Sequence, residues 1–190
     1  MGVAQLPFPF YPRHLTLVST LTIGVPAFFL ALAPNRRRAR PHFLRRVLRF
    51  TVPAGLVAAS ATFAAYAVAS LETDLGVPAS RTAATVVLFG VGMTVLALLA
   101  YPLSRLELLL LAALVATFAV LLAVPAAREF FALSTLPLLV WASAGLLVAV
   151  AGAALVAVWW FALRPDEVEP SARERPRRST GDPRPANLDR

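Results

Sequence analysis

The sequence has 190 residues, of which 58% are hydrophobic and 15% charged, and its 18 basic residues, all arginine, outnumber 10 acidic ones. A soluble domain averages about 45–50% apolar and about 25% charged residues, so the composition excludes an ordinary soluble enzyme and indicates a membrane protein. The absence of cysteine excludes disulfides and thiol chemistry, and two histidines far apart, His14 and His42, indicate no metal cluster.

The first predicted element is an extracytoplasmic segment, residues 1–14, followed by a membrane span at Leu15–Ala33. A span requires about 20 mostly apolar residues, and it is helical because lipid offers the main chain no hydrogen-bond partner. Residues 1–12 lack the positive charge with which a signal peptide begins. A chain that starts outside and enters a span directly suggests a missing helix before it, so we expect the C-terminal piece of a longer protein.

Pro26 predicts an irregular helix inside this first span. Proline lacks an amide hydrogen and repels the carbonyl four residues back, here that of Thr22, while Gly24 adds flexibility. The same stretch carries the hydroxyl groups of Thr16, Ser19, Thr20 and Thr22. Freed carbonyls and hydroxyls are oxygen ligands that suit hard cations. The alternative is a proline kink in which the hydroxyls bond back to their own helix, and both interpretations stay open.

Residues 8–35, FPFYPRHLTLVSTLTIGVPAFFLALAPN, resemble the sixth transmembrane helix of P-type cation-transporting ATPases, in particular a bacterial calcium-transporting branch. In calcium-pump-like members this helix reads roughly N-L-x-T-D-G-x-P-A. Ser19 and Ile23 stand at the Asn and Asp positions, so the ion's identity does not transfer. The resemblance implies five spans from this helix onward, a cytoplasmic C-terminus and an ion pathway. The pathway residues that it implies are Ser19, Thr20, Thr22, Gly24 and Pro26.

The connection after the first span, Pro34–Arg49, contains seven arginines. Such a loop indicates the cytoplasmic side and contact with anionic lipid headgroups. The resemblance adds a second interpretation, docking to a cytoplasmic phosphorylation domain. The candidate loop contacts are Arg36, Arg37, Arg38, Arg45 and Arg46. Nucleic acid is not expected as a partner, because no aromatic residues alternate with the charge.

Four more apolar runs complete a predicted all-α bundle of five transmembrane helices. The five predicted spans are residues 15–33, 50–71, 82–101, 106–124 and 138–163. Apart from Glu107 near one span's start, they contain no Asp, Glu, Lys, Arg or His side chain. Intramembrane ionisable groups usually indicate transport, so we expect these five helices not to be a complete transporter.

Small residues recur at four-residue spacing in two of the spans, which predicts close helix packing. One ridge comprises Ala54, Ala58, Ala61, Ala65 and Ala69, and the other Gly145, Ala149, Ala153 and Ala157. An alanine-rich composition is the alternative explanation. Gly90 and Gly92 predict a packing notch rather than a ligand site.

The last segment, residues 164–190, is rich in Arg, Pro and acidic residues, which predicts a disordered tail. With this tail, the Pro34–Arg49 loop and Arg105 on one side, fifteen of the eighteen arginines share that side. The positive-inside rule then predicts a multi-pass protein of the cell membrane with its N-terminus outside and its C-terminus in the cytoplasm.

We therefore expect the C-terminal membrane region of a P-type ATPase involved in cation transport, with the lipid bilayer and the missing N-terminal part of the pump as partners. The resemblance suggests calcium as the transported cation. The motifs D-K-T-G-T, G-D-G-x-N-D and T-G-E are absent from this chain, so ATP and magnesium would bind the missing domains, and no cofactor, catalytic residue or metal ligand is assigned here. The alternatives are a stand-alone structural or interaction protein of the membrane and, less favoured, a small independent carrier.

Overall fold

The computed structural model describes residues 9–32, 43–71 and 76–163, and every regular element in these ranges is helical. The predicted all-α class is thereby confirmed. The elements are α1 (Pro12–Ser19), η1 (Thr20–Gly24, a turn of π-helix), α2 (Val25–Leu32), α3 (Phe43–Leu71), α4 (Gly76–Leu99), α5 (Arg105–Ala123), α6 (Pro125–Phe131) and α7 (Leu138–Leu163). The predicted tail, residues 164–190, lies outside the described residues.

Four of the described helices are long and apolar enough to cross a membrane. The stretches concerned are Leu48–Leu71, Gly76–Leu99, Arg105–Ala123 and Leu138–Phe161, and they correspond to four of the five predicted spans. The remaining predicted span, Leu15–Ala33, is divided among α1, η1 and α2 and is therefore not one uninterrupted α-helix.

Two of the helices begin well before the apolar runs from which the spans were predicted. α3 begins at Phe43 rather than Phe50, because leucine and arginine are good helix formers whether or not they lie in lipid. α4 begins at Gly76, whose φ of +68° is tolerated by glycine. The predicted connection between the last two spans contains the short helix α6, which starts with Pro125 in its first turn.

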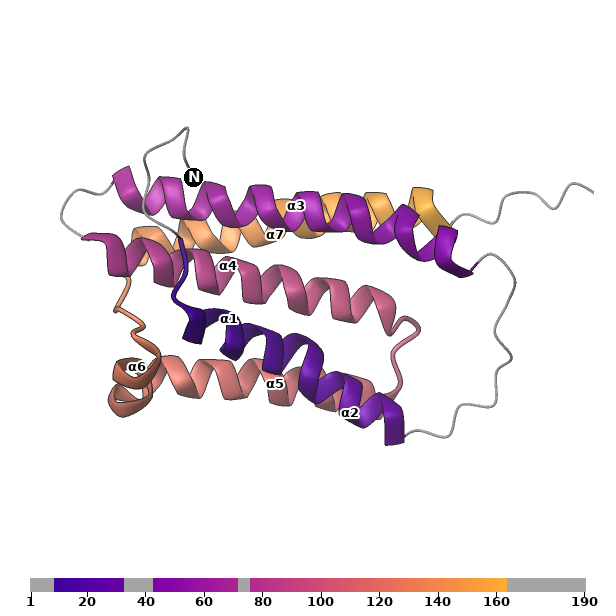
Figure 1. Cartoon of the computed structure of the whole chain (residues 1–190), viewed down its shortest axis with the longest axis horizontal. Coiled ribbons are helices and arrows are strands. Elements are labelled where there is room, and N and C mark those ends of the chain that lie inside the picture. Colours follow the sequence, from indigo (N-terminus) through magenta and orange to yellow (C-terminus); the bar gives the residue numbers. More distant parts are fainter. Residues whose placement is uncertain (1–8, 33–42, 72–75, 164–190) are drawn as a thin grey trace, which may run out of the picture.

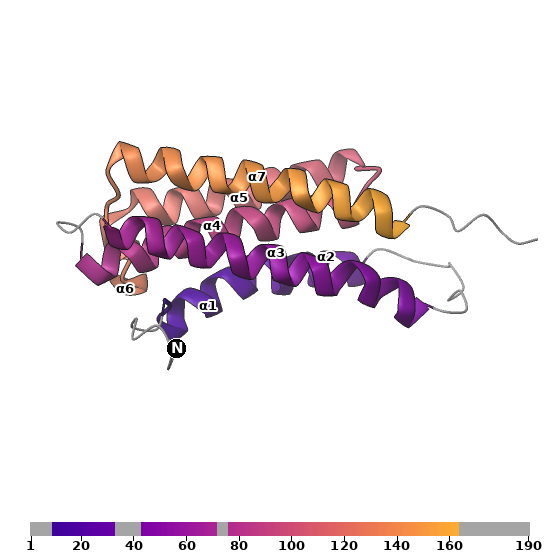
Figure 2. The same ribbon diagram turned by 90° about the horizontal axis from the view of Figure 1, so that it is seen from above.

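Helix α4 is the central element of the bundle. In Figure 1 it lies between α3 and α7 on one side and α1 and α5 on the other, and Figure 2 shows the same helices from above. In the most apolar stretch of α4, 44% of the residues are buried inside the bundle, whereas the share is 11% in that of α5. Because α4 is apolar all round, it can pack against both groups of helices at once.

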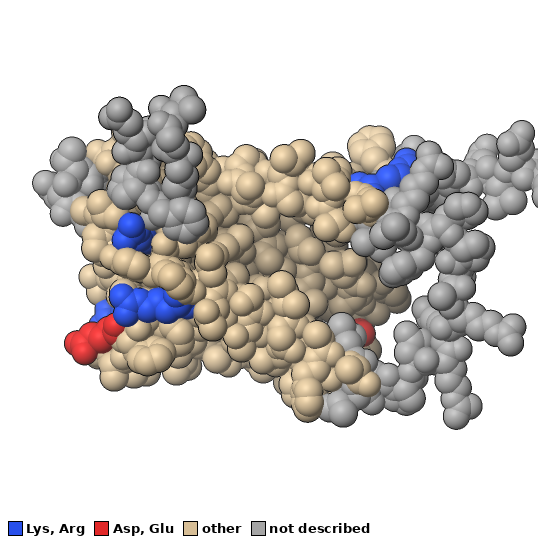
Figure 3. Space-filling view, viewed as in Figure 1, with Lys and Arg blue, Asp and Glu red and all other residues tan. Residues whose placement is uncertain are grey.

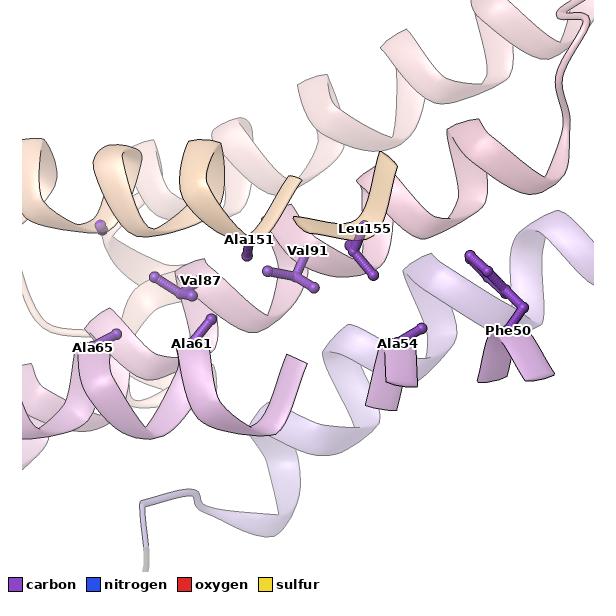
Figure 4. Close-up of a cluster of buried hydrophobic side chains, with 9 residues drawn as sticks. Phe50, Ala54, Ala61, Ala65, Val87, Val91, Ala151 and Leu155 are labelled. Carbon is purple, nitrogen blue, oxygen red and sulfur yellow. The ribbon is translucent and has the colours of Figure 1, made fainter. Parts of the chain in front are cut away.

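The first core cluster joins α3, α4 and α7 (Figure 4). Val87 and Val91 of α4 pack there against alanines of α3 and against Ala151 and Leu155 of α7. The predicted alanine ridge on α3 is confirmed, since Ala54, Ala61, Ala65 and Ala69 are buried.

The predicted ridge on α7 was wrong. Gly145, Ala149, Ala153 and Ala157 are all exposed, and the buried face is formed by Ala144, Ala151 and Leu155 instead. An all-apolar helix can bury any of its faces, so the partners on α4 rather than the four-residue spacing decide which one is used.

The second core cluster holds the interrupted helix against the rest of the bundle. Leu17 and Leu21 pack there with Phe89 and Met93 of α4 and with Phe118 of α5. The rings of Phe89 and Phe118 are stacked with their centroids 4.0 Å apart. Helices α1 and η1 are therefore fixed on one side by large apolar side chains.

Charged side chains lie at the two ends of the bundle and leave an uncharged band between them on the face shown in Figure 3. Arg13, Arg81 and Arg128 are on α1, α4 and α6, whereas Arg49 and Arg105 are near the starts of α3 and α5. Helix α1 begins at one end of the bundle and α7 finishes at the other (Figure 1).

A capping box starts α5 where the chain turns from α4. The main-chain N–H of Ser104 donates to Glu107 Oε2 at 2.6 Å, and the N–H of Glu107 donates to Ser104 Oγ at 3.3 Å. We expect Ser104→Ala to lower the free energy of unfolding by about 1 kcal/mol, because main-chain donors lose their partner. Unfolding by sodium dodecyl sulfate, followed by circular dichroism, measures this. Ser60→Ala is the control, since the Ser60 hydroxyl bonds back to Leu56 O and Val57 O within α3, and equal losses in both variants would contradict the prediction.

Candidate functional site

The candidate site is the interrupted helix, whose course is set by two prolines. Tyr11 precedes α1 in an extended conformation, and Pro12 occupies the first turn, where its missing N–H has no helical partner to lose. The π-turn η1 follows, and the N–H of Val25 donates to Thr20 O, five residues back. Pro26 comes next and has no N–H to donate. The helix is thus widened immediately before the proline, as is common at functional sites.

The hydroxyl groups on this helix donate to its own carbonyls. Thr16 Oγ1 donates to Pro12 O at 3.1 Å, Ser19 Oγ to Thr16 O at 3.2 Å, and Thr22 Oγ1 to Val18 O at 2.8 Å. The hydroxyls thus bond back to their own helix, as in one of the two interpretations that the sequence allows. A hydroxyl that donates one hydrogen bond still has lone pairs on its oxygen, so back-bonding leaves these oxygens able to accept a cation.

The hydroxyl-bearing face lines a cavity of about 690 Å³ between α1/η1, α3 and α4. Its lining is mostly apolar, and its polar side chains are all hydroxyls, those of Thr16, Ser19, Thr22 and, from α3, Thr51. The described residues contain no group of three or more His, Asp or Glu side chains that could hold a metal ion. Among the described residues, the side-chain oxygens that line the cavity belong to hydroxyl groups and are neutral.

The structure brings only some of the predicted pathway residues together. Ser19 and Thr22 line the cavity, whereas Thr20 and Gly24, which are exposed, and Pro26, which is buried, are not among its lining residues. Of the predicted loop contacts, Arg36, Arg37 and Arg38 lie outside the described residues, and Arg45 and Arg46 belong to the first turns of α3.

Two cavity residues were missed by the sequence analysis. Thr51 is on α3 and Gly92 on α4, both distant in sequence from the Pro26 segment. No local motif marks Thr51. Gly92 was noticed as a packing notch, and only the tertiary structure shows that the interrupted helix packs there.

The start of α1 is attached to the bundle by a cluster of aromatic and basic side chains. The guanidinium groups of Arg13 and Arg81 lie 5.0 and 4.2 Å from the centre of the Tyr11 ring, within the range of cation–π attraction. Arg13 Nη1 also donates to Phe130 O at 3.0 Å. His14 is fully buried and meets the edge of the Tyr11 ring. These contacts fix the end of the interrupted helix that precedes the cavity.

His14, one residue before the predicted span, gives this cluster a pH dependence. Burial, together with the charges of Arg13 and Arg81, lowers the pKa of His14 below its usual value of 6.5, and neither ring nitrogen has a hydrogen-bond partner among the described residues. Below pH 6.5 the unfolded chain binds the proton more readily than the folded one. We therefore expect the free energy of unfolding to fall as the pH drops from 6.5 towards the lowered pKa, by up to about 1.4 kcal/mol per pH unit.

Detergent unfolding at a series of pH values measures this dependence. His14→Gln is expected to flatten the profile below pH 6.5, since glutamine does not titrate. A slope that is the same in His14→Gln and in the unsubstituted chain would show that another group causes it.

No family model and no solved structure matches this chain, but three known proteins are similar to it in sequence. The calcium-transporting ATPase CtpE of Mycolicibacterium smegmatis is 39% identical over 163 residues, which are 84% of this chain and 20% of that protein. The proteins of the same name from Mycobacterium bovis and Mycobacterium tuberculosis are each 41% identical, over 86% of this chain and 21% of their own length. The chain thus spans about a fifth of the length of these curated relatives and matches their C-terminal part.

Proposed function

This chain corresponds to the C-terminal membrane region of P-type cation-transporting ATPases, and we propose that its interrupted helix forms one wall of the cation pathway of such a pump. The observation that carries the proposal is the π-turn before Pro26, which lies beside a mostly apolar cavity whose polar side chains are all hydroxyls. The proposed pathway residues are Ser19, Thr20, Thr22, Gly24 and Pro26. Ser19 and Thr22 would contact the cation side directly, and the other three would shape the turn.

The chemistry of this wall suits Ca²⁺ as the transported substrate. Calcium takes six to eight oxygen ligands and accepts carbonyl and hydroxyl oxygens in flexible geometries. A π-turn followed by a proline provides carbonyls that lack the usual donor four residues on, and the side chains of Ser19 and Thr22 add hydroxyls. A divalent charge in a medium of low dielectric constant requires compensation by negative groups. Since the oxygens here are neutral, we propose that carboxylates from another part of the pump complete the site.

The cavity also provides a surface for that other part. On the α3 side its wall includes, beside Phe50 and Thr51, the small residues Ala54, Gly55 and Ala58. Small residues of this kind let transmembrane helices approach closely. We propose that a helix from the remaining part of the pump packs there. The segment with Arg36, Arg37, Arg38, Arg45 and Arg46 would face the cytoplasm, near the domain that binds ATP and magnesium, with the N-terminus of this chain outside.

Transport by a fusion protein tests the proposal. The part of the M. smegmatis relative that precedes the matched region is joined to this chain, and Ca²⁺-stimulated ATP hydrolysis and ATP-dependent ⁴⁵Ca²⁺ uptake are measured in membrane vesicles. We expect both activities in the fusion protein and neither in the relative's N-terminal part alone. A well-folded fusion protein without Ca²⁺-dependent hydrolysis would contradict the proposal and favour a stand-alone structural role in the membrane.

A further inference from the structure

Two glycines of α4 are sites of close approach by neighbouring helices. A Cβ added at Gly92 would lie 2.9 Å from Thr22 Cγ2 and 3.4 Å from Thr22 Cβ, and a Cβ added at Gly90 would lie 2.8 Å from Val148 Cγ2. The distances of 2.9 Å at Gly92 and 2.8 Å at Gly90 are shorter than Cβ atoms show in real structures. Threonine and valine are short, branched side chains with one rotatable bond, so the new methyl group would displace a helix rather than a flexible side chain.

The neighbour of Gly92 belongs to the candidate pathway, whereas the neighbour of Gly90 does not. Thr22 lies in the π-turn and lines the cavity, its hydroxyl donates to Val18 O at 2.8 Å, and its methyl group lies against α4 at Gly92. Val148 lies on α7, on the other side of α4, and packs into the first core cluster. Both glycines therefore allow a neighbouring helix to approach α4 closely. At Gly92 that neighbour is the π-turn of the candidate pathway, and at Gly90 it is α7.

The contact at Gly92 sets how close the π-turn lies to the central helix. Leu21, adjacent to Thr22, is buried in the cluster that includes Phe89 and Met93 of α4, so the turn is also held against α4 at the residue that precedes Thr22. A displacement of this turn by a fraction of an ångström would move the Thr22 hydroxyl and the neighbouring carbonyls together.

From this geometry we infer that Gly92 is a positioning residue for the cation pathway. Because Gly92 has no side chain, the π-turn can lie close to α4, and this distance sets where the oxygen ligands of the turn are placed. The inference rests on the proposed function for its transport consequence, but the contact itself can be tested on this chain alone.

Thiol labelling tests the contact in the full chain. The chain has no cysteine, so Leu21→Cys introduces a single thiol at a side-chain position that is 6% exposed. In this background we expect Gly92→Ala to raise the rate of modification by N-ethylmaleimide several-fold in detergent. Gly145→Ala is the matched control, since nothing lies within 4 Å of a Cβ there. Adding Thr22→Ser, which removes the methyl group but keeps the hydroxyl, is expected to restore the slow rate.

Transport kinetics test the consequence in the fusion protein described above. We expect Gly92→Ala to raise the Ca²⁺ concentration for half-maximal ATP hydrolysis about tenfold, with Thr22→Ser partly reversing the shift. Gly90→Ala is expected to lower thermal stability without changing that concentration, and Val148→Ala, not Thr22→Ser, is expected to restore stability.

The outcomes separate the inference from the function on which it rests. Unchanged labelling in Gly92→Ala would show that the contact does not position the turn and would overturn the inference. Faster labelling with an unchanged Ca²⁺ dependence would reduce Gly92 to a packing residue and would overturn it as well. An unsubstituted fusion protein without Ca²⁺-dependent hydrolysis would count against the proposed function, and thereby against the transport part of the inference, while the labelling result would still decide the contact.

Discussion

Pro26→Ala in the fusion protein is expected to lower the apparent affinity for Ca²⁺ about a hundredfold while making the membrane bundle more stable. An alanine at position 26 has an N–H that can donate to Thr22 O, four residues back, and this favours a regular α-helix over the π-turn Thr20–Gly24. Removing a proline from a helix interior relieves a cost of about 3 kcal/mol. Stability and affinity should therefore change in opposite directions. Ca²⁺-dependent ATP hydrolysis and thermal unfolding in detergent measure the two.

Pro53→Ala is the matched control for this substitution. Pro53 also lies inside a helix, α3, but it is not among the residues that line the cavity. We expect it to raise stability in the same direction and to leave the Ca²⁺ dependence unchanged. If Pro26→Ala hydrolysed ATP with the same Ca²⁺ dependence as the unsubstituted fusion protein, the π-turn would have no part in cation binding.

Thr22→Val is expected to lower the apparent affinity for Ca²⁺ about tenfold, the effect of losing about 1.4 kcal/mol of binding free energy. Valine has nearly the shape of threonine, so the packing against Gly92 is kept, but the hydroxyl oxygen of this cavity-lining residue is lost. The maximal rate of hydrolysis at saturating Ca²⁺ should change less than the affinity, because the substitution removes a ligand and leaves the bundle in place.

Thr117→Val provides the comparison. Thr117 Oγ1 donates to Ala113 O at 2.8 Å, the same back-bond at the same distance as that of Thr22, but on an exposed face of α5. Both variants lose one hydrogen bond within a helix, so any general effect of that loss appears in both. Equal Ca²⁺ dependence in the two variants would remove Thr22 from the pathway.

Much of the fold could be predicted from sequence because lipid limits the possible structures. Long apolar runs must be helical, and four of the five predicted spans are membrane-length helices. Helix ends were harder to predict, since α3 continues outwards to Phe43 through arginines that carry no hydropathy signal. The buried face of α7 was not predictable either, because an apolar helix has no distinct side until its partners are known.

Only the part of the candidate site that depends on neighbouring residues in the sequence could be predicted. Pro26 and Gly24 indicated an irregular helix, and the structure has a π-turn there. Ser19 and Thr22, which both line the cavity, are three residues apart, and this spacing places them on one face of a helix, whereas Thr20 lies off that face. Thr51 and Gly92 join the site from α3 and α4 through helix packing, and sequence spacing alone does not encode this.

Protection of a thiol by calcium tests most directly whether the interrupted helix lines the cation pathway. In a fusion protein freed of other cysteines, the thiol introduced by Ser19→Cys lies on the cavity, and that introduced by Ser60→Cys lies on an exposed part of α3 away from it. We predict that Ca²⁺, but not the same concentration of Mg²⁺, slows modification at position 19 by a small thiol reagent and leaves position 60 unaffected. If Ca²⁺ changed neither rate, or both equally, this helix would not line the pathway.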